Sequence, residues 1–297
     1  MLRIIADSTC DISKEDARKM GIQIVPISVR FGNEEFLDGV EITHEEFYTR
    51  LAECDELPKT SQPSPDTFMK VFNEAVAAGD DVLGIFISSD LSGTYQSACL
   101  AASDVEDETG KKLYMVDSRS ASIGTALLIR EAVKLRDAGV NVSDIAAACT
   151  EMSKYIKLTA VVGSLKYLKM GGRLSGAAAF AGTMLHITPV VSIEDGKVVV
   201  IGKTRGKKAA EKLMHDKLTE DGLSLTRDFM FGHINCSESL ETFINKSLTY
   251  ISDVNGNVGV SSIGCSVGTH VGPGTYGIAY VEAAESGMNR ESIVKTA

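Results

Sequence analysis

The chain has 297 residues, of which 44% are hydrophobic and 24% charged, and its formal net charge is −10. A single hydrophobic core rarely serves a chain of this length, so the length predicts two domains. The negative charge argues against a nucleic-acid-binding protein, because such proteins present a basic face to the phosphates. The sequence shows neither a run of roughly 18 apolar residues nor a secretory signal, so we expect a cytoplasmic protein without a transmembrane segment.

The first half of the chain alternates short β-branched runs with longer helical patterns. Strands are expected at 2–6, 22–30, 82–88 and 112–116. Helices are expected at 14–20, 44–52, 65–78, 93–105, 124–138 and 142–155. The strand at 82–88 is apolar almost throughout, which is typical of a parallel strand that is buried on both faces. This βαβ repetition predicts a parallel α/β domain over residues 1–160.

Three of these helices have clear start signals. Ser13 is a suitable N-cap, and Gly21 marks the end of the same helix. Thr43 and Glu46 have the spacing of a capping box. Ser64 precedes a proline that would occupy the first helical position. These residues should fix where the helices begin, whatever the tertiary packing.

The second half has a different texture. A short helix is expected at 165–170, and an Asp-Gly dipeptide at 195–196 between two apolar runs predicts a tight hairpin. Antiparallel strands are expected at 190–193, 197–201, 229–234, 258–267 and 277–281. The second domain, residues 161–297, is therefore predicted to be α+β with an antiparallel sheet. Residues 284–297 have little apolar periodicity and are expected to form a loosely held tail.

Cysteine and histidine spacing does not predict a metal site. Neighbouring cysteines are at least 29 residues apart, so we expect free, reduced thiols and no metal. The five histidines include no pair four residues apart. His215 lies among lysines and glutamates and is expected at the surface, whereas His233 is expected in a strand. His270 lies in a glycine-rich stretch, expected to be a loop whose glycines let a ligand approach the backbone.

Polar loops follow the predicted parallel strands, where ligands bind in open α/β sheets. They are 7–9, 89–92 and 117–118, and a fourth polar loop at 60–62 leads into a helix. Ser92 is expected to precede a helix. Its hydroxyl and the free N–H groups of Gly93 and Thr94 could then bind an anion. The same serine could instead be a plain N-cap, which is the commoner role of a serine before a helix.

The motifs of common enzyme classes are missing around these loops. Ser92 is not within Gly-x-Ser-x-Gly, and neither a P-loop nor a Gly-x-Gly-x-x-Gly motif occurs. Two enzymatic alternatives stay open on the residues alone. One is a serine hydrolase or acyltransferase that uses Ser92 and His270, and the other is a phosphotransfer module in which His270 accepts phosphate.

Six short motifs carry a family resemblance. They are Asp-Ser-Thr-Cys-Asp at 7–11, Thr-Ser-Gln-Pro-Ser at 60–64, Ser-Ser-Asp-Leu-Ser-Gly-Thr-Tyr at 88–95, Asp-Ser at 117–118, Lys-Met-Gly-Gly-Arg-Leu-Ser at 169–175 and Gly-Thr-His-Val-Gly-Pro-Gly at 268–274. In this order and spacing they resemble the DegV family of bacterial proteins, over about residues 1–283. The ordered set is highly specific, although each motif alone is weak.

The resemblance implies a non-catalytic protein that binds one long-chain fatty acid, such as palmitate or oleate. The α/β domain would supply loops for the carboxylate, and the α+β domain would close over the acyl chain in an interdomain tunnel. The family's carboxylate-binding residues fall on Thr60 or Ser61, on Ser92 and on His270. We also assign the N–H groups of Gly93 and Thr94 to this site because they follow Ser92 at the expected helix start.

The resemblance also implies a partner, because some members of the family carry the acyl substrate of a bacterial fatty acid kinase. The ATP-using subunit phosphorylates the carboxyl group of the bound fatty acid. Basic residues that meet this subunit would fall on Arg173 and Arg205. No further cofactor is expected, and we expect a monomer.

Elementary energetics is consistent with this interpretation. Each buried CH₂ contributes about 0.8 kcal/mol, so the acyl chain would supply most of the affinity. The carboxylate must still be paired, because a bare buried charge is very costly. Hydroxyls of Thr60 and Ser92 with helix N–H groups are expected to satisfy it without a neighbouring cation. The small residues at 176–185 suit either a tunnel wall or close helix packing.

Overall fold

The computed structural model describes residues 1–297 except 55, 177–186, 225, 252–254 and 284–297. The expected small-residue wall (apart from Gly176) and the expected tail lie outside the described residues. None of the described helices is long and apolar enough to cross a membrane.

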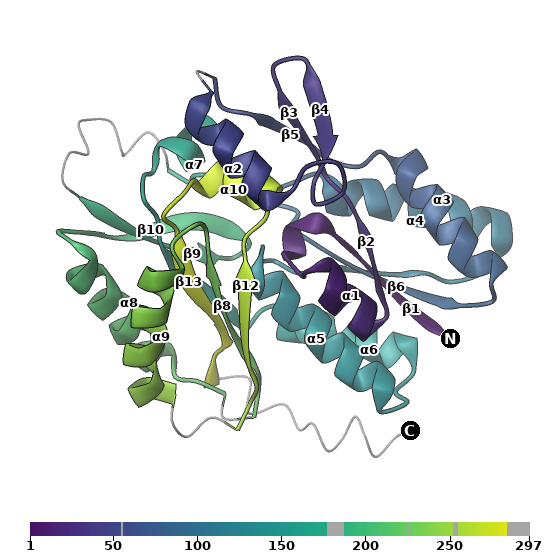
Figure 1. Cartoon of the computed structure of the whole chain (residues 1–297). Coiled ribbons are helices and arrows are strands. Elements are labelled where there is room, and N and C mark those ends of the chain that lie inside the picture. Colours follow the sequence, from purple (N-terminus) through teal and green to yellow (C-terminus); the bar gives the residue numbers. More distant parts are fainter. Residues whose placement is uncertain (55, 177–186, 225, 252–254, 284–297) are drawn as a thin grey trace.

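The N-terminal half is built on a four-stranded parallel sheet (Figure 1). Its strands, in spatial order, are β2 (Ile22–Val25), β1 (Leu2–Asp7), β6 (Asp81–Phe86) and β7 (Tyr114–Asp117). Side chains alternate between its faces, so Ile4 packs against one layer of helices and Ile5 against the other. The first layer comprises α1 (Lys14–Met20), α5 (Ile123–Asp137) and α6 (Val142–Met152). The second comprises α3 (Pro65–Ala77) and α4 (Thr94–Thr109).

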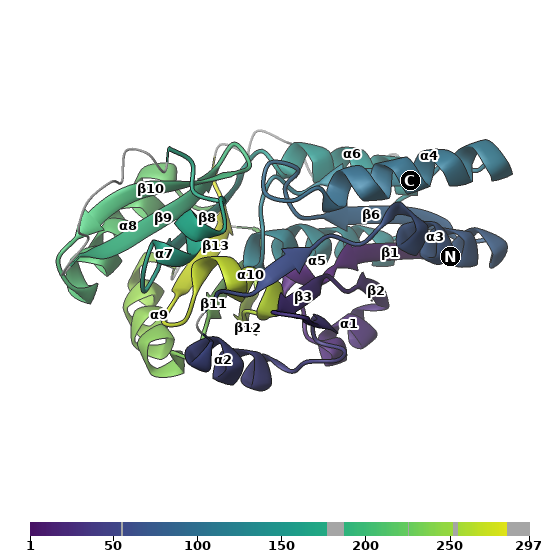
Figure 2. The ribbon, with the colours of Figure 1, turned by 90° about the horizontal axis from the view of Figure 1, so that it is seen from above.

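The C-terminal half is built on a six-stranded mixed sheet. The strands, in spatial order, are β10 (Lys197–Thr204), β9 (Thr188–Glu194), β8 (Ile156–Val161), β13 (Tyr276–Val281), β11 (Phe229–His233) and β12 (Val258–Ser262). Helices α8 (Lys207–Asp221) and α9 (Ser237–Ile251) cover one face. The other face turns toward α5, which is packed between the two sheets and buries most of its residues (Figure 2). A helix that contacts apolar layers on both sides must be apolar nearly all round.

A third, small sheet lies where the two halves meet. It contains β4 (Glu34–Leu37), β3 (Ser28–Phe31) and β5 (Lys59–Ser61), with the 3₁₀ turn η1 (Ser8–Cys10) nearby. Helix α10 (Cys265–Val271) contacts β3 and β5, and α2 (His44–Glu53) and α7 (Lys166–Met170) pack against α10. Tyr48 links α2 to the residues just before α10, because its hydroxyl donates to the carbonyls of Ile263 and Gly264. This junction positions α10 against the N-terminal half.

The predicted helix starts are confirmed. The Ser13 hydroxyl accepts the Asp16 N–H, and Gly21 ends α1 with a φ of 61°. Both halves of the Thr43–Glu46 capping box form. Ser64 caps α3, with proline at the first helical position. Start signals that lie next to their helix are therefore readable from the sequence.

The fold class is confirmed, but two expected strands are wrong. The run 22–30 breaks at Pro26, which cannot donate to a ladder, so β2 joins the parallel sheet and β3 joins the small sheet. The run 258–267 forms a strand only to Ser262. That strand, β12, pairs parallel to β11 and not antiparallel, and the chain then turns into α10.

Three short strands have no counterpart among the expected elements: β4, β5 and β8. β8 pairs with β9 and β13 within the six-stranded sheet. The expected domain boundary after residue 160 falls inside this strand. The expected hairpin is confirmed, since Lys197 of β10 pairs with Glu194 of β9 across the Asp-Gly turn.

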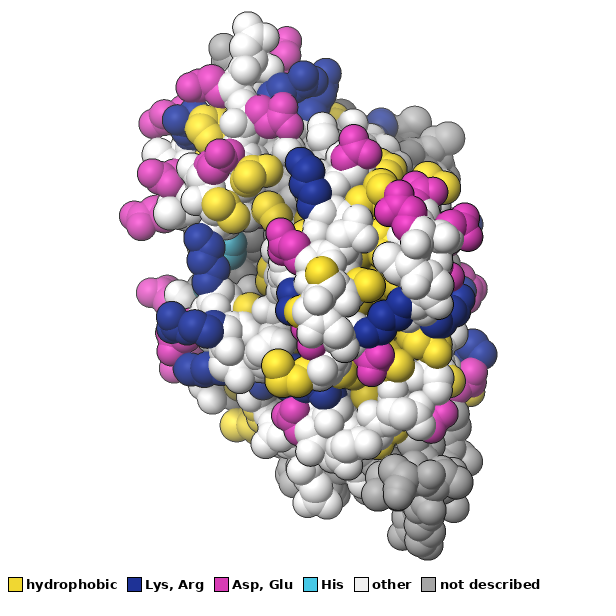
Figure 3. Space-filling view, turned by 90° about the vertical axis from the view of Figure 1, so that its right-hand side faces the viewer, with side chains coloured by type: hydrophobic (Ala, Val, Ile, Leu, Met, Phe, Trp, Pro, Cys, Tyr) yellow, Lys and Arg dark blue, Asp and Glu magenta, His cyan; other side chains and the backbone are white. Residues whose placement is uncertain are grey.

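Acidic and basic side chains are interspersed on the face of the molecule shown in Figure 3. That face does not present one continuous basic surface.

Candidate functional site

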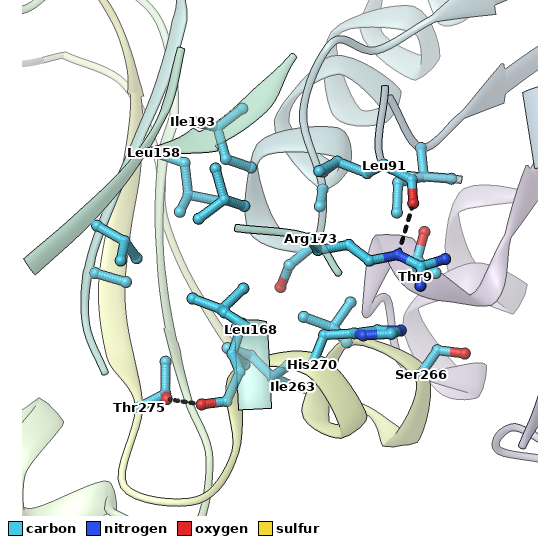
Figure 4. Close-up of a pocket in the computed structure, with 18 of the residues that line it drawn as sticks. Thr9, Leu91, Leu158, Leu168, Arg173, Ile193, Ile263, Ser266, His270 and Thr275 are labelled. Carbon is cyan, nitrogen blue, oxygen red and sulfur yellow. Dashed lines mark hydrogen bonds between the residues drawn. The ribbon is translucent and has the colours of Figure 1, made fainter. Parts of the chain in front are cut away.

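A cavity lies between the two large sheets, with about 920 Å³ of free space when its open mouth is included. The six-stranded sheet supplies apolar walls, and loops of the N-terminal half close the opposite side (Figure 4). Wall residues from the sheet are Leu158, Ala160, Val191, Ile193 and Val198. Ile87, Leu91 and Ile123 face them from the N-terminal half. The arrangement offers an elongated apolar ligand contact with both halves of the molecule.

Polar side chains gather at one end of this cavity. Figure 4 shows Thr9, Arg173, Ser266 and His270 on the side away from Leu158 and Ile193. Thr60 and Ser92 line the same cavity. The cavity therefore has the two-ended character of a site for an amphiphile.

Thr60 reaches the cavity because it lies in β5, where it pairs with Val29. Successive side chains of a strand point to opposite faces. Ser61 is accordingly exposed and does not line the cavity. The expected loop at 60–62 is thus partly a strand, and its two candidate hydroxyls are separated by the strand's alternation.

His270 lies in the last turn of α10, and the expected loop at this position is therefore wrong. Its Nε2 lies 3.0 Å from the Thr60 hydroxyl. Its Nδ1 is buried and has no hydrogen-bond partner among the described residues. Burial, and secondarily the positive charge of Arg173, lowers the pKa of His270 to about 4. The imidazole is therefore neutral near pH 7.

Gly171 holds the other side of the His270 ring. A Cβ added at Gly171 would lie 2.3 Å from His270 Nδ1, closer than real contacts allow. Glycine at this position lets the end of α7 approach α10 directly. The ring is consequently fixed between Gly171 and Thr60.

Ser92 lines the cavity from the loop that leads into α4. The helix begins at Thr94 with Gly93 as its N-cap, one residue later than expected. The Ser92 hydroxyl nevertheless accepts the Thr94 N–H at 3.3 Å and pairs with the Thr94 hydroxyl at 2.9 Å. The Gln62 side chain packs against Gly93 and donates to Ser97 at 2.8 Å, which joins the β5 loop to α4.

Arg173 lines the same polar end, which differs from the expectation that no cation would be near. Its Nε donates to the Leu91 carbonyl at 3.1 Å and its Nη1 to the Gly171 carbonyl at 2.6 Å. These bonds connect the glycine beside His270 to the residue before Ser92. Arg205, in contrast, is exposed between β10 and α8 and does not line the cavity.

Sequence reasoning did not find Ser266 or Ser122, which also line the cavity, whereas Thr9 lies in the polar loop at 7–9 that was expected near a ligand. Ser266 is buried, and its hydroxyl has no partner among the described residues. It precedes His270 by four residues, a spacing that places both on one helix face, but this stretch was expected as a strand and a loop. The helix signal was missed because nothing beside α10 in the sequence marks its start.

Ser122 is held in a rare backbone conformation at the edge of the cavity, with a φ of 52°. Its N–H donates to the Thr9 carbonyl at 2.8 Å, and its hydroxyl donates to Asp11. Burial raises the pKa of Asp11 well above its usual value. These contacts fix the first polar loop against the start of α5.

The structure also tests the positions that the sequence predicted for His233 and His215. His233 ends β11, as expected. His215 is buried, so its expected surface position is wrong: its Nε2 lies 2.9 Å from the Ser247 hydroxyl. Its ring stacks on Phe243 and Tyr250, and burial lowers its pKa. Lys212 and Asp216 beside it are exposed, whereas the buried Glu211, four residues earlier, lies on the same face of α8 as His215.

The geometry does not assemble a catalytic triad from Ser92 and His270. The described hydrogen bonds of His270 go to Thr60 and not to Ser92. Its Nδ1 has no carboxylate to orient it within the described part of the chain. A serine nucleophile needs a hydrogen-bonded base that is oriented by a third group. The arrangement is suited to holding a polar head group.

Comparison with known proteins shows which family this chain is similar to. The family model described as the DegV family matches residues 1–283. A DegV domain-containing protein of Clostridium perfringens is 34% identical over 290 residues, which are 95% of this chain and 98% of its own. One from Clostridium acetobutylicum is 36% identical over 289 residues, or 94% of this chain and 97% of its own.

Solved structures show the same fold. A DegV family protein from Thermus thermophilus, whose structure is described as fatty acid binding, has 31% identity and a TM-score of 0.84, covering 94% of this chain and 99% of its own. A stearic acid-binding protein from Eubacterium ventriosum has 29% identity and a TM-score of 0.85, covering 96% of this chain and 100% of its own. The whole described fold is therefore shared with these proteins.

Proposed function

Because the chain belongs to the DegV family, we propose that it binds one long-chain fatty acid, such as palmitate or oleate, in the cavity between its two sheets. The observation that carries this proposal is a cavity with apolar walls and a polar cluster at one end. The fatty acids bound by the related solved proteins support it. The proposal assigns a carrier role and no catalytic residue to this chain.

The acyl chain lies against the apolar walls. Leu158 and Ile193 of the six-stranded sheet face Leu91 and Ile123 of the N-terminal half across the cavity. Each buried CH₂ contributes about 0.8 kcal/mol, so ten methylenes contribute about 8 kcal/mol before the cost of ordering the chain. In this proposal both halves contribute to the head-group site, and the six-stranded sheet, which includes Leu158 of β8, covers the acyl chain.

The carboxylate lies at the polar end. The neutral His270 imidazole has no acceptor near Nδ1, so we place its proton on Nε2, from which it donates to the Thr60 oxygen. The Thr60 hydroxyl proton is then free to donate to the carboxylate. The Ser92 and Ser266 hydroxyls donate to its other lone pairs, and the Arg173 guanidinium supplies positive charge.

Three other predicted residues have supporting or peripheral places. Thr94 orients the Ser92 hydroxyl, and Gly93 leaves room for the Gln62 side chain. The exposed Ser61 takes no part in the site. This assignment narrows the carboxylate contacts to Thr60 and Ser92 among the predicted hydroxyls.

Native mass spectrometry of the purified protein tests the proposal. We expect one co-purifying ligand with the mass of a fatty acid, released on denaturation. Delipidated protein should take up one oleate. A protein that neither carries nor takes up a fatty acid would refute the carrier role. Stoichiometric labelling of Ser92 by a fluorophosphonate would instead indicate a hydrolase.

We further propose that the protein presents its fatty acid to an ATP-dependent kinase subunit. Support comes from the family resemblance and from the exposed Arg205, which is near the exposed Lys207 and Lys208. With such a kinase and ATP, the loaded protein should yield an acyl phosphate that hydroxylamine traps. Arg205→Glu should reduce its yield while oleate binding is unchanged. An unchanged yield would remove Arg205 from the kinase surface.

A further inference from the structure

Away from the cavity wall, the structure brings together three side chains that are far apart in the sequence. Asp38 follows β4, His44 is the first residue of α2, and Cys265 is the first residue of α10. One ligand atom of each lies within 4.8 Å of those of the other two. We propose that Asp38, His44 and Cys265 form a binding site for one divalent transition-metal ion, with Zn²⁺ as the occupant.

The donor set selects the class of metal. A thiolate, an imidazole and a carboxylate suit Zn²⁺, whereas Mg²⁺ and Ca²⁺ prefer oxygen donors alone. Zinc bonds of roughly 2.0–2.3 Å place ligand atoms about 3–4 Å from one another, so small rotations of the side chains would close the site. Three protein ligands leave the fourth tetrahedral position for water.

Gly264 provides an independent indication that space and donors converge here. A Cβ at this residue would lie 3.0 Å from Asp11 Oδ1, 3.0 Å from His44 Nε2 and 3.5 Å from Asp38 Oδ1. Three potential ligand atoms thus lie close to Gly264, whose missing side chain leaves them room. Any larger residue at 264 would crowd the donors.

The acidic side chains near Gly264 also favour a bound cation. Asp11 and Asp38 are both buried, and their partners are neutral hydroxyl and amide groups. Within the described ranges, neither carboxylate forms a salt bridge with a lysine or arginine. Burial raises the pKa of Asp11 and so favours its neutral form, whereas Asp38 is a buried carboxylate without a counter-ion that a bound Zn²⁺ would compensate.

The existing hydrogen bonds are compatible with coordination. Asp38 Oδ2 accepts the Ser266 N–H at 3.0 Å and the Ser8 hydroxyl at 3.2 Å, whereas Oδ1 accepts the Cys265 N–H at 3.2 Å and has a second lone pair for an ion. His44 is half-buried, which gives an ion a route from solvent. Binding converts the Cys265 thiol to a thiolate, and its proton leaves to the buffer, so affinity should rise with pH.

An ion bound at this site would restrict the position of α10. The helix carries Cys265 at its first residue and His270 in its last turn. An ion held jointly by the β4–α2 connection would fix the helix that lines the polar end of the cavity. The inference does not depend on fatty-acid binding, because metal binding can be measured on delipidated protein.

Cobalt(II) titration of the full-length, reduced and chelator-treated protein tests the site. We expect one equivalent to produce a thiolate-to-cobalt charge-transfer band, and Zn²⁺ to abolish it by displacement. Cys265→Ser should lose the band. His44→Gln, at a half-buried position, should weaken cobalt binding at least tenfold. Cys99→Ser, a half-buried thiol of α4, is the matched control and should keep the band.

Thermal unfolding with Zn²⁺ provides a second readout. Zn²⁺ should raise the Tm of the wild type and of Cys99→Ser, but not of His44→Gln. The proposal is overturned if the wild type gives no charge-transfer band at one equivalent. It is also overturned if the band persists in Cys265→Ser, or if Zn²⁺ raises the Tm of His44→Gln as much as that of the wild type.

Discussion

At the scale of the residue, the polar end of the cavity depends on contacts that tolerate little change. Gly171, His270 and Thr60 form a row in which each fixes the next. Arg173 connects the same glycine to the loop of Ser92 through the Leu91 carbonyl. A substitution at one of these positions should therefore weaken binding of the fatty-acid head group.

Gly171→Ala is the mildest change that tests this row. Gly171 has a φ of −75°, so alanine is not strained there, but its Cβ would meet His270 Nδ1. We expect the ring to be displaced from the position in which it bonds to Thr60 and oleate binding to weaken about tenfold, the effect of one lost hydrogen bond to a charged group. Titration calorimetry measures this. Met170→Ala, an exposed neighbour, is the control. Equal affinities for the two variants would contradict the packing argument.

The neutral state of His270 has a consequence for stability. Its pKa is about 4 in the folded protein against 6.5 unfolded, so below pH 6.5 the unfolded chain binds the proton more readily. Stability from this residue is fully present above pH 6.5 and declines as the pH falls toward 4, by roughly 3 kcal/mol at most.

Urea unfolding of delipidated protein at several pH values measures this contribution. Because burial also lowers the pKa of His215 and His233, the comparison must be made with a variant. His270→Gln should lose less stability than the wild type between pH 6.5 and pH 4. Identical pH profiles would show that His270 does not titrate with a lowered pKa.

At the scale of the element, α10 shows what the sequence could not predict. Helices α1, α2 and α3 carry their N-caps beside them in the sequence, and all three starts were predicted. The start of α10 is satisfied by Asp38, 227 residues before Cys265. A cap supplied by tertiary structure leaves no local signal, so the helix was taken for a strand and a loop.

The contact between Asp38 and the start of α10 should also contribute to the stability of the fold. Asp38→Ala should leave the buried N–H groups of Cys265 and Ser266 without an acceptor. We expect the free energy of unfolding to fall by about 2–4 kcal/mol, the desolvation cost of two orphaned donors. Denaturant unfolding with the chelator present removes any contribution of a bound metal. Asp137→Ala, at an exposed carboxylate, is the control and should change stability by less than about 0.5 kcal/mol.

The carboxylate site was also predicted incompletely, because strand β5 was not recognised from the sequence. Thr60 and Ser61 were equally good candidates while their segment was expected to be a loop. Three residues are too short a run for a strand to be recognised by periodicity. Once β5 pairs with β3, alternation places Thr60 in the cavity and exposes Ser61.

At the scale of the whole molecule, the cavity exists only because two separate sheets face one another. The sequence predicted both sheets and several polar residues, but not the part of the apolar wall that β8 supplies through Leu158 and Ala160. The tip of the β9–β10 hairpin also reaches the N-terminal half: Ser88 donates to the Gly196 carbonyl at 2.8 Å, and Arg119 pairs with Asp195 at 3.0 Å. Contacts of this kind cannot be read from local pattern.

A ligand that spans both halves should stabilise the molecule as a unit. A fatty acid at a hundred times its Kd would contribute about 2.7 kcal/mol, provided that the unfolded chain does not bind it. Calorimetry should therefore show a higher Tm for oleate-loaded protein than for delipidated protein. An alkane of equal length, which lacks the carboxylate, should raise the Tm less. An equal rise with the alkane would show that the polar end contributes nothing to binding.

The central claim is that the polar end holds a fatty-acid carboxylate, and oleate titration of delipidated Ser92→Ala and Ser61→Ala tests it most directly. Ser92 lines the cavity, whereas Ser61 is exposed. We expect Ser92→Ala to raise the Kd about ten- to a hundredfold, the effect of a lost hydrogen bond to a charged group. Ser61→Ala should bind as the wild type does. If the wild type does not bind oleate, or if the two substitutions weaken binding equally, the assignment of the site is wrong.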